Sequence, residues 1–292
     1  MMDSPSFQRG WSPFLYLIIA IFAVSCSAIL IRLTHTSPIV IAFYRQTFSA
    51  IMLLPFVNRD PEVVLSRKNY MLLIVSGLFL ALHFAAWITG LTYTTVARAT
   101  LFVDLQPIWA AILGAILLKE RLSVVEALAV LLVSIGGIFS VGSHWKEGGT
   151  SLLGDGLSAA GGIAGACYLL IGRKVRSEIS WLRYMFSVYY FSAIWLLLFH
   201  LALFRSFPVP YQKDLVWIVA MALIPSILGH GLFNAAIRKL KAYVVNAAFL
   251  GEPVLATFFA YLLFRETPDP SYYMGATLVL TGLLILFLRQ RR

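Results

Sequence analysis

Charged residues are scarce in this sequence. Asp, Glu, Lys and Arg make up 12% of the 292 residues, which is about half the share found in a typical soluble domain. Hydrophobic residues make up 60%, and the mean hydropathy is +0.84. This composition excludes an ordinary soluble protein and predicts an integral membrane protein.

The signatures of several enzyme and metal-site classes are also missing. The chain has two cysteines, Cys26 and Cys167, and both fall in apolar stretches, so we expect neither a structural disulfide nor a zinc site. The sequence contains no G-x-x-x-x-G-K-[ST] phosphate-binding loop and no H-E-x-x-H motif. We therefore expect no cofactor, no bound metal and no enzymatic activity.

Apolar runs of about 20 residues, long enough to cross a bilayer core, recur along the whole chain. Inside lipid the backbone must satisfy its own hydrogen bonds, and runs of this length are too long for barrel strands. The fold class predicted is therefore an all-α integral membrane protein with ten transmembrane helices. The predicted spans are 13–33, 38–57, 70–91, 95–117, 124–141, 153–171, 181–203, 214–236, 243–264 and 271–288.

Basic residues gather in alternate loops between these spans. If the N-terminus is cytoplasmic, 16 of the 23 Lys and Arg residues lie in cytoplasmic segments and four in the opposite loops. By the positive-inside rule this bias places both termini in the cytoplasm, and we expect the bacterial inner (plasma) membrane as the location. The net charge of +10 therefore reflects topology, and we expect no nucleic-acid partner.

The chain contains an internal repeat. Residues 97–139 can be laid over 243–285 without a gap, at an offset of 146 residues. Each copy has a polar residue followed by Pro, then a Glu thirteen residues after that Pro, and later a Gly: Gln106, Pro107, Glu120 and Gly136 in one copy, Glu252, Pro253, Glu266 and Gly282 in the other. This order predicts a duplication, with repeats at 1–146 and 147–292. Five spans per repeat would make the halves inverted copies, an arrangement typical of secondary transporters.

Four charged residues within the spans are candidate substrate or coupling groups. Asp104 and Glu252 lie about nine residues into the fourth and ninth spans, where a carboxyl is costly. They are candidates for binding a substrate amine or a proton, and pairing with Arg or supporting a kink is the structural alternative. Arg45 and Arg98 lie toward the outer ends of the second and fourth spans. They either extend to the membrane interface or bind a substrate carboxylate.

Two histidines predict a polar lining at matching depth in the two halves. His83 and Trp87 are four residues apart in the third span and share a helix face. His230 and Asn234 have the same spacing in the eighth span, and at the repeat offset His230 falls on Phe84. Structural hydrogen bonding is the alternative role. Three aromatics also lie deep and would suit a substrate with an apolar or planar body: Tyr44, Trp109 and Tyr168.

Prolines and glycines mark candidate points of movement. Pro107 and Pro253 lie well inside their spans, where each removes a backbone donor and predicts a kink. Gly161 and Gly165 are four residues apart in the sixth span and allow a neighbouring helix to approach closely. These residues serve either gating or static packing.

The repeat motifs resemble the EamA-type branch of the drug/metabolite transporter superfamily across essentially the whole chain. The residues that carry the resemblance are Ala42-Phe43-Tyr44-Arg45, Leu53-Leu54-Pro55, Ala97-Arg98-Ala99-Thr100, Gln106-Pro107, Lys119-Glu120-Arg121-Leu122-Ser123, Glu252-Pro253 and Arg265-Glu266-Thr267. The family pattern has Gly where this chain has Lys119 and Arg265, at helix ends where the fold does not depend on it.

Within the superfamily the chain looks most similar to the ten-helix metabolite and amino-acid exporters. The resemblance implies export of amino acids, with aromatic or apolar ones as candidates, or of similar small metabolites. It also implies alternating access around a cavity between helices 1–4 and 6–9.

Several alternatives stay open from the sequence. Within the superfamily they are a drug, purine or nucleotide-sugar transporter, and outside it an intramembrane enzyme or a non-transporting membrane assembly factor. Protons are a candidate coupling ion beside a simple facilitator mechanism, and nothing in the sequence requires an oligomer.

Overall fold

The computed structural model describes residues 13–60, 65–119, 122–140, 152–264 and 270–290. Each of the ten predicted spans appears in it as one helix or as consecutive helical segments. The proposed boundary between repeats, at 146 and 147, lies outside the described residues. In chain order the spans are α2 (Pro13–Ser25) with α3 (Ser27–Arg32), α4 (Pro38–Val57), α5 (Arg67–Gly90), α6 (Val96–Asp104) with α7 (Gln106–Leu117), α8 (Val124–Ser140), α9 (Leu152–Val175), α10 (Trp181–Phe204), η2 (Gln212–Asp214) with α11 (Leu215–Met221), η3 (Ala222–His230) and α12 (Gly231–Ala236), α13 (Ala242–Phe249) with α14 (Gly251–Phe264), and α15 (Pro270–Gln290).

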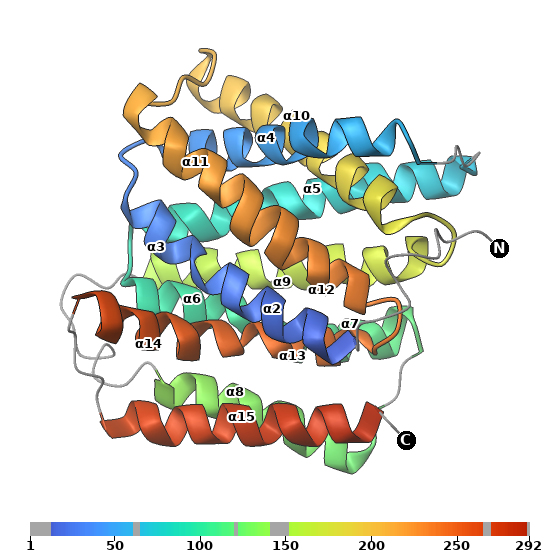
Figure 1. The fold of residues 1–292 in the computed structure, drawn as a ribbon, viewed down its shortest axis with the longest axis vertical. Coiled ribbons are helices and arrows are strands. Elements are labelled where there is room, and N and C mark those ends of the chain that lie inside the picture. Colours follow the sequence, from blue (N-terminus) through green and yellow to red (C-terminus); the bar gives the residue numbers. More distant parts are fainter. Residues whose placement is uncertain (1–12, 61–64, 120–121, 141–151, 265–269, 291–292) are drawn as a thin grey trace.

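The helices have the length and composition of membrane spans. Eight helical segments of the described chain are long and apolar enough to cross a bilayer, and two shorter apolar helices, Val124–Ser140 and Ala242–Leu255, occupy the positions of the fifth and ninth predicted spans. The all-α membrane fold predicted from the sequence is thus confirmed. The start of α2 and the end of α15 lie on the same side of the molecule (Figure 1), as an even number of spans requires.

Helix packing follows the duplication. The first span packs on the eighth through α2, η3 and α12, and the third packs on the sixth through α5 and α9. Exchanging the two halves converts one of these pairs into the other. The same exchange maps three further contacts onto themselves: α4 with α10, α7 with α13, and α8 with α15. In Figure 1 the pairs α4/α10 and α8/α15 lie at opposite edges of the molecule, so the remaining helices form its centre.

Two central spans are broken at equivalent places. The fourth span is interrupted at Leu105, and the ninth between Phe249 and Gly251. Pro107 and Pro253 lie in the first turn after each break, where a proline removes no helical hydrogen bond. The eighth span has a different irregularity, a π-helical segment around Pro225, and such segments occur frequently at functional sites.

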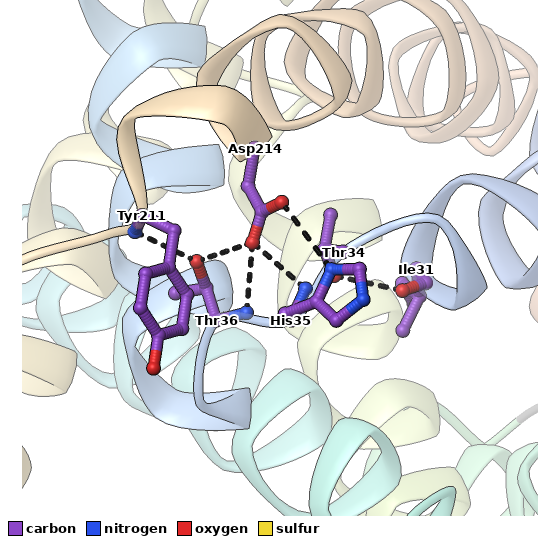
Figure 2. A network of polar contacts seen from close by, with 6 residues as sticks. All are labelled: Ile31, Thr34, His35, Thr36, Tyr211 and Asp214. Atoms are coloured by element: carbon purple, nitrogen blue, oxygen red, sulfur yellow. Dashed lines mark hydrogen bonds and ion pairs between the residues drawn. The ribbon is translucent and has the colours of Figure 1, made fainter.

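Hydrogen bonds to a buried carboxyl connect the two halves at one end of the molecule (Figure 2). Asp214 accepts hydrogen bonds from the backbone nitrogens of His35 and Thr36 at 2.7 and 2.9 Å, and from Thr36 Oγ1 at 2.8 Å. The Tyr211 nitrogen donates to the same Thr36 hydroxyl at 3.0 Å. Asp214 is 1% exposed. This Asp214 clasp ties the loop before α4 to the loop before α11.

A corresponding clasp lies at the other end of α4. Asp60 follows α4 and accepts a hydrogen bond from Ser180 Oγ, and Arg183 Nε lies 3.2 Å from Asp60 Oδ2. Ser180 precedes α10 as Thr36 precedes α4, so exchanging the halves relates the Asp60 clasp to the Asp214 clasp. Because Thr36 and Asp60 flank the 20-residue α4, the two clasps hold opposite ends of the molecule.

The Asp214 clasp is expected to contribute measurably to stability. Asp214→Ala removes the oxygen that accepts from three donors and should cost about 1–3 kcal/mol, the penalty of unsatisfied buried groups. Thermal unfolding of the purified protein in detergent should therefore begin at a lower temperature than for wild type. The adjacent exposed residue provides a control, since Lys213→Gln should not change the transition. Equal unfolding temperatures for Asp214→Ala and wild type would show that the clasp is dispensable.

Candidate functional site

A cavity lies at the centre of the helix bundle, where both halves meet. The first half contributes from α2 through α7, and the second from η3, α13 and α14. The lining contains both apolar and ionisable side chains: Val24, Ser27, Arg45, His83, Trp87, Val103, Asp104, Gln106, His230, Phe249 and Glu252.

Arg45 turns inward and is 0% exposed. Its Nε donates to Ser226 Oγ at 2.7 Å and its Nη1 to Ser27 Oγ at 3.0 Å, while the guanidinium carbon lies 4.2 Å from the centre of the Phe84 ring. The expectation that this side chain extends to the membrane interface is therefore wrong. Nη2 has no hydrogen-bond partner in the described structure, so a fixed guanidinium presents one unused donor nitrogen.

Two buried carboxyls line the same cavity. Asp104 ends α6 and Glu252 lies in the first turn of α14, so each is placed by a helix break. They are 2% and 5% exposed, and among the described residues Asp104 Oδ2 and Glu252 Oε1 have no hydrogen-bond partner. An unpartnered carboxylate is expensive in the membrane interior. These two oxygens are the acceptors available to a cationic ligand.

Aromatic rings form another wall. His83 Nδ1 lies 2.9 Å from the Gly161 carbonyl oxygen, which can only accept, so this nitrogen carries the hydrogen. The His83 ring stacks on Trp87 with centroids 6.2 Å apart and lies 5.9 Å from His230. Trp87 Nε1 and His230 Nδ1 have no partner within the described residues. The wall therefore offers ring faces together with two unused polar atoms.

A second layer supports this wall from behind. Asn234 Nδ2 donates to the Tyr168 hydroxyl and to the His230 carbonyl at 2.9 Å, and the rings of Tyr168 and His230 are 6.1 Å apart. Neither Tyr168 nor Asn234 reaches the lining. Both were expected to contact substrate directly, and the structure places them against His230 instead.

The remaining predicted residues lie elsewhere. Tyr44 donates a hydrogen bond to the Pro208 carbonyl at 3.1 Å, and Trp109 is half-buried outside the cavity lining. Arg98 forms an ion pair with Asp155, which also accepts from Thr94 Oγ1 at 3.0 Å. Arg98 is thus engaged in a contact between α6 and α9 rather than presented to the cavity.

Comparison with known proteins identifies the family. The profile of the EamA-like transporter family matches residues 11–142 and 152–288. The chain belongs to the EamA-like transporter family. The predicted resemblance is confirmed. The protein is a multi-pass membrane protein, and its family consists of transporters, not enzymes.

Relatives of this EamA-like transporter differ in their named substrates. It is 27% identical over 262 residues to the S-adenosylmethionine uptake transporter of Rickettsia prowazekii, covering 86% of this chain and 83% of the relative. It is 23% identical over 278 residues to the probable amino-acid metabolite efflux pump of Salmonella typhimurium, covering 92% of each chain. A solved crystal structure, 19% identical, superposes with a TM-score of 0.77 over 96% of this chain and 98% of the other. That structure shares the fold.

The structure also adds lining residues that were not predicted. Gln106 was noted only as the repeat counterpart of Glu252, yet its side chain is buried in the cavity wall with Nε2 unpartnered among the described residues. The repeat alignment could have identified it. Ser27, Val103 and Phe249 gave no such signal, since small and apolar residues fill every span.

Every side chain that lines the cavity of this EamA-like transporter is buried. The space not filled by atoms is at most about 260 Å³, below the roughly 300–1,000 Å³ of ordinary ligand sites. Both clasps are formed, so the two halves are held together at each end of the molecule. The structure therefore has the features of an occluded state that must open to exchange a ligand.

Glycines of α9 allow the close packing around the cavity. A Cβ at Gly161 would lie 3.1 Å from the His83 carbonyl oxygen. At Gly165 it would lie 2.6 Å from Gln106 Oε1 and 2.8 Å from His83 Nδ1. A Cβ at the neighbouring Gly162 would meet the backbone, 2.6 Å from the Val103 carbonyl oxygen.

These distances predict different effects for two alanine substitutions. Gly162→Ala must displace backbone and should cost about 1–3 kcal/mol through overpacking. Gly165→Ala meets side chains alone, the end of Gln106 and the His83 ring, which can shift at a smaller cost than backbone. Thermal unfolding in detergent should therefore show the larger decrease for Gly162→Ala. Gly156→Ala is the control, because nothing lies within 4 Å of its Cβ position. A larger decrease for Gly165→Ala would contradict this packing.

Proposed function

We propose that this chain is a secondary transporter for amino acids or closely similar small metabolites. The observation that carries the proposal is the chemistry of the central cavity, where a guanidinium, two carboxyls and a wall of rings face one closed space. An amino acid presents the matching groups: a carboxylate, an ammonium and a side chain. The named substrate of the Salmonella relative, an amino-acid metabolite, supports the same class.

Each lining group has a proposed role. Arg45 binds the substrate carboxylate through Nη2, the nitrogen that the two serines leave unpartnered, in a charge-assisted hydrogen bond. Glu252 and Asp104 accept hydrogen bonds from the ammonium. Trp87, His83 and His230 contact the body of the substrate, with Tyr168 and Asn234 holding His230 in place.

Transport would proceed by alternating access. The moving units are the two repeats, 1–146 and 147–292, and opening at one end requires release of the clasp at that end while the other stays formed. The breaks before Pro107 and Pro253 give the broken spans freedom to bend, and the close contact at Gly161 and Gly165 would slide. The loop charges support cytoplasmic termini and a bacterial inner-membrane location, and export is the direction that we propose.

A second candidate substrate is S-adenosylmethionine, the named substrate of the Rickettsia relative. This molecule combines an amino-acid group with a sulfonium and a planar base, so it could use the carboxyls and the aromatic wall together. Its transport would require a larger opening of the closed cavity. The Rickettsia relative is named for uptake and the Salmonella one for efflux.

Counterflow in proteoliposomes tests the proposal. Wild-type protein should exchange at least one substrate of a panel containing amino acids and S-adenosylmethionine. His83→Ala or Trp87→Ala should lower that exchange at least about tenfold, the effect of losing roughly 1.4 kcal/mol of binding. Flux is compared per amount of folded, reconstituted protein, because truncating these buried side chains also lowers the unfolding temperature. Trp109→Phe, outside the lining, is the control. Wild-type flux in both alanine variants would remove these residues from the site.

The same assay tests proton coupling. Asp104 and Glu252 are candidate proton carriers, because protonation and binding of a substrate ammonium would compete for the same oxygens. Repeating the counterflow with an imposed pH gradient distinguishes a proton antiporter from a facilitator, whose net flux follows the substrate gradient alone.

A further inference from the structure

The charges that line the central cavity do not cancel. Arg45 supplies one positive charge, and Asp104 and Glu252 supply two carboxyls. The guanidinium keeps one unpartnered nitrogen, and each carboxyl keeps one unpartnered oxygen in the described structure. No ion pair joins Arg45 to either carboxyl among the described residues. When both carboxyls are ionised, a ligand that pairs with all three groups brings one anionic and two cationic groups.

The excess negative charge comes from an asymmetry between the repeats. Positions 106 and 252 correspond at the repeat offset, and both side chains line the cavity. Gln106 and Glu252 are nearly identical in size, so the two sites differ mainly by one charge. The unpartnered Nε2 of Gln106 shows that the amide is not held in place by a protein acceptor.

We propose that the pair at positions 106 and 252 sets the net charge of the substrate, and that the preferred substrates are α-amino acids whose side chain carries a further positive group. The inference rests on the proposed function and narrows its substrate class. Arg45 binds the carboxylate, and the two carboxyls receive the α-ammonium and the side-chain cation. Trp87 and Phe249 also line the cavity, and aromatic faces attract such cations.

Gln106 limits this preference. A carboxylate at position 106 would add a third negative charge and favour substrates of higher positive charge. An amide there donates or accepts a hydrogen bond without changing the charge count. The transporter then selects between substrates by a difference in binding free energy. A substrate whose cation meets a carboxylate in the water-poor cavity binds more tightly than one that leaves this charge unpaired.

Matched substrate pairs test this inference. The first pair is lysine and norleucine, and the second is S-methylmethionine and methionine. Within each pair the main difference is the side-chain cation. Counterflow is measured in proteoliposomes at pH 8, where imidazoles of ordinary pKa are neutral and the side chains of lysine and S-methylmethionine keep their positive charge. The readout is the ratio of kcat/KM for the cationic and neutral members, which does not depend on the amount of active protein.

Wild type should prefer the cationic member of each pair about tenfold or more, as expected for one charge-assisted contact. Glu252→Gln should lower this ratio about tenfold. The swapped variant, Gln106→Glu with Glu252→Gln, preserves the charge count and should recover the wild-type ratio. Should the swapped variant not fold, Asp104→Asn takes its place, because removing the other carboxyl must lower the ratio as well.

Glu126→Gln is the matched control. Glu126 is a buried carboxyl outside the cavity lining, where it bonds Lys241 and Tyr243, so its loss should leave the ratio unchanged. A wild-type ratio of one or less, an unchanged ratio in Glu252→Gln, or a folded swapped variant with the ratio of Glu252→Gln would overturn the inference while leaving amino-acid transport intact. Folded wild-type protein that exchanges none of the four compounds or the wider panel would overturn the proposed function as well.

Discussion

A guanidinium buried beside two carboxyls inside a membrane protein constrains the rest of this structure. Arg45 cannot be solvated by lipid, so protein groups must surround it. Ser27, Ser226 and Phe84 meet this need, and they come from three different spans. The break between α2 and α3, the π-helical segment η3 and the face of α5 therefore converge on one side chain.

The carboxyls impose a second requirement. Asp104 and Glu252 flank the interruptions of the fourth and ninth spans, where helix ends bring polar groups to the centre of the bundle. Transporters use such broken helices near the bilayer midplane to hold substrate. Close approach of α9 at its glycines then reduces the remaining space to a closed cavity. Binding chemistry and packing thus depend on the same helix breaks.

Symmetry and asymmetry have separate places in the molecule. The helix contacts and the two clasps are related by the symmetry that exchanges the two halves. A mechanism that closes each end of the molecule in turn requires such equivalence. The cavity lining departs from this symmetry, because Gln106 corresponds to Glu252, and Asp104 to Leu250. In the proposed mechanism the symmetric scaffold provides the movement and the asymmetric positions provide recognition.

The sequence predicted the spans well and the site in part, for identifiable physical reasons. Hydropathy locates every span because lipid imposes a minimum apolar length. Depth along a span, however, does not fix the direction in which a side chain points. Tyr44 and Trp109 were expected to contact substrate but do not line the cavity. Arg45 turns inward, where Ser27 and Ser226 accept its hydrogen bonds in the folded chain. The pairing of Arg98 with Asp155 likewise depends on how α6 packs on α9.

Access to the cavity from both membrane faces is the most direct test of the account. A single cysteine would be introduced as Val103→Cys after Cys26 and Cys167 are replaced by Ser, and labelled with a membrane-impermeant thiol reagent in vesicles of either orientation. The account predicts labelling from both faces, slowed by a transported amino acid. Labelling from one face alone, or at a rate that substrate does not change, would contradict a central site of alternating access.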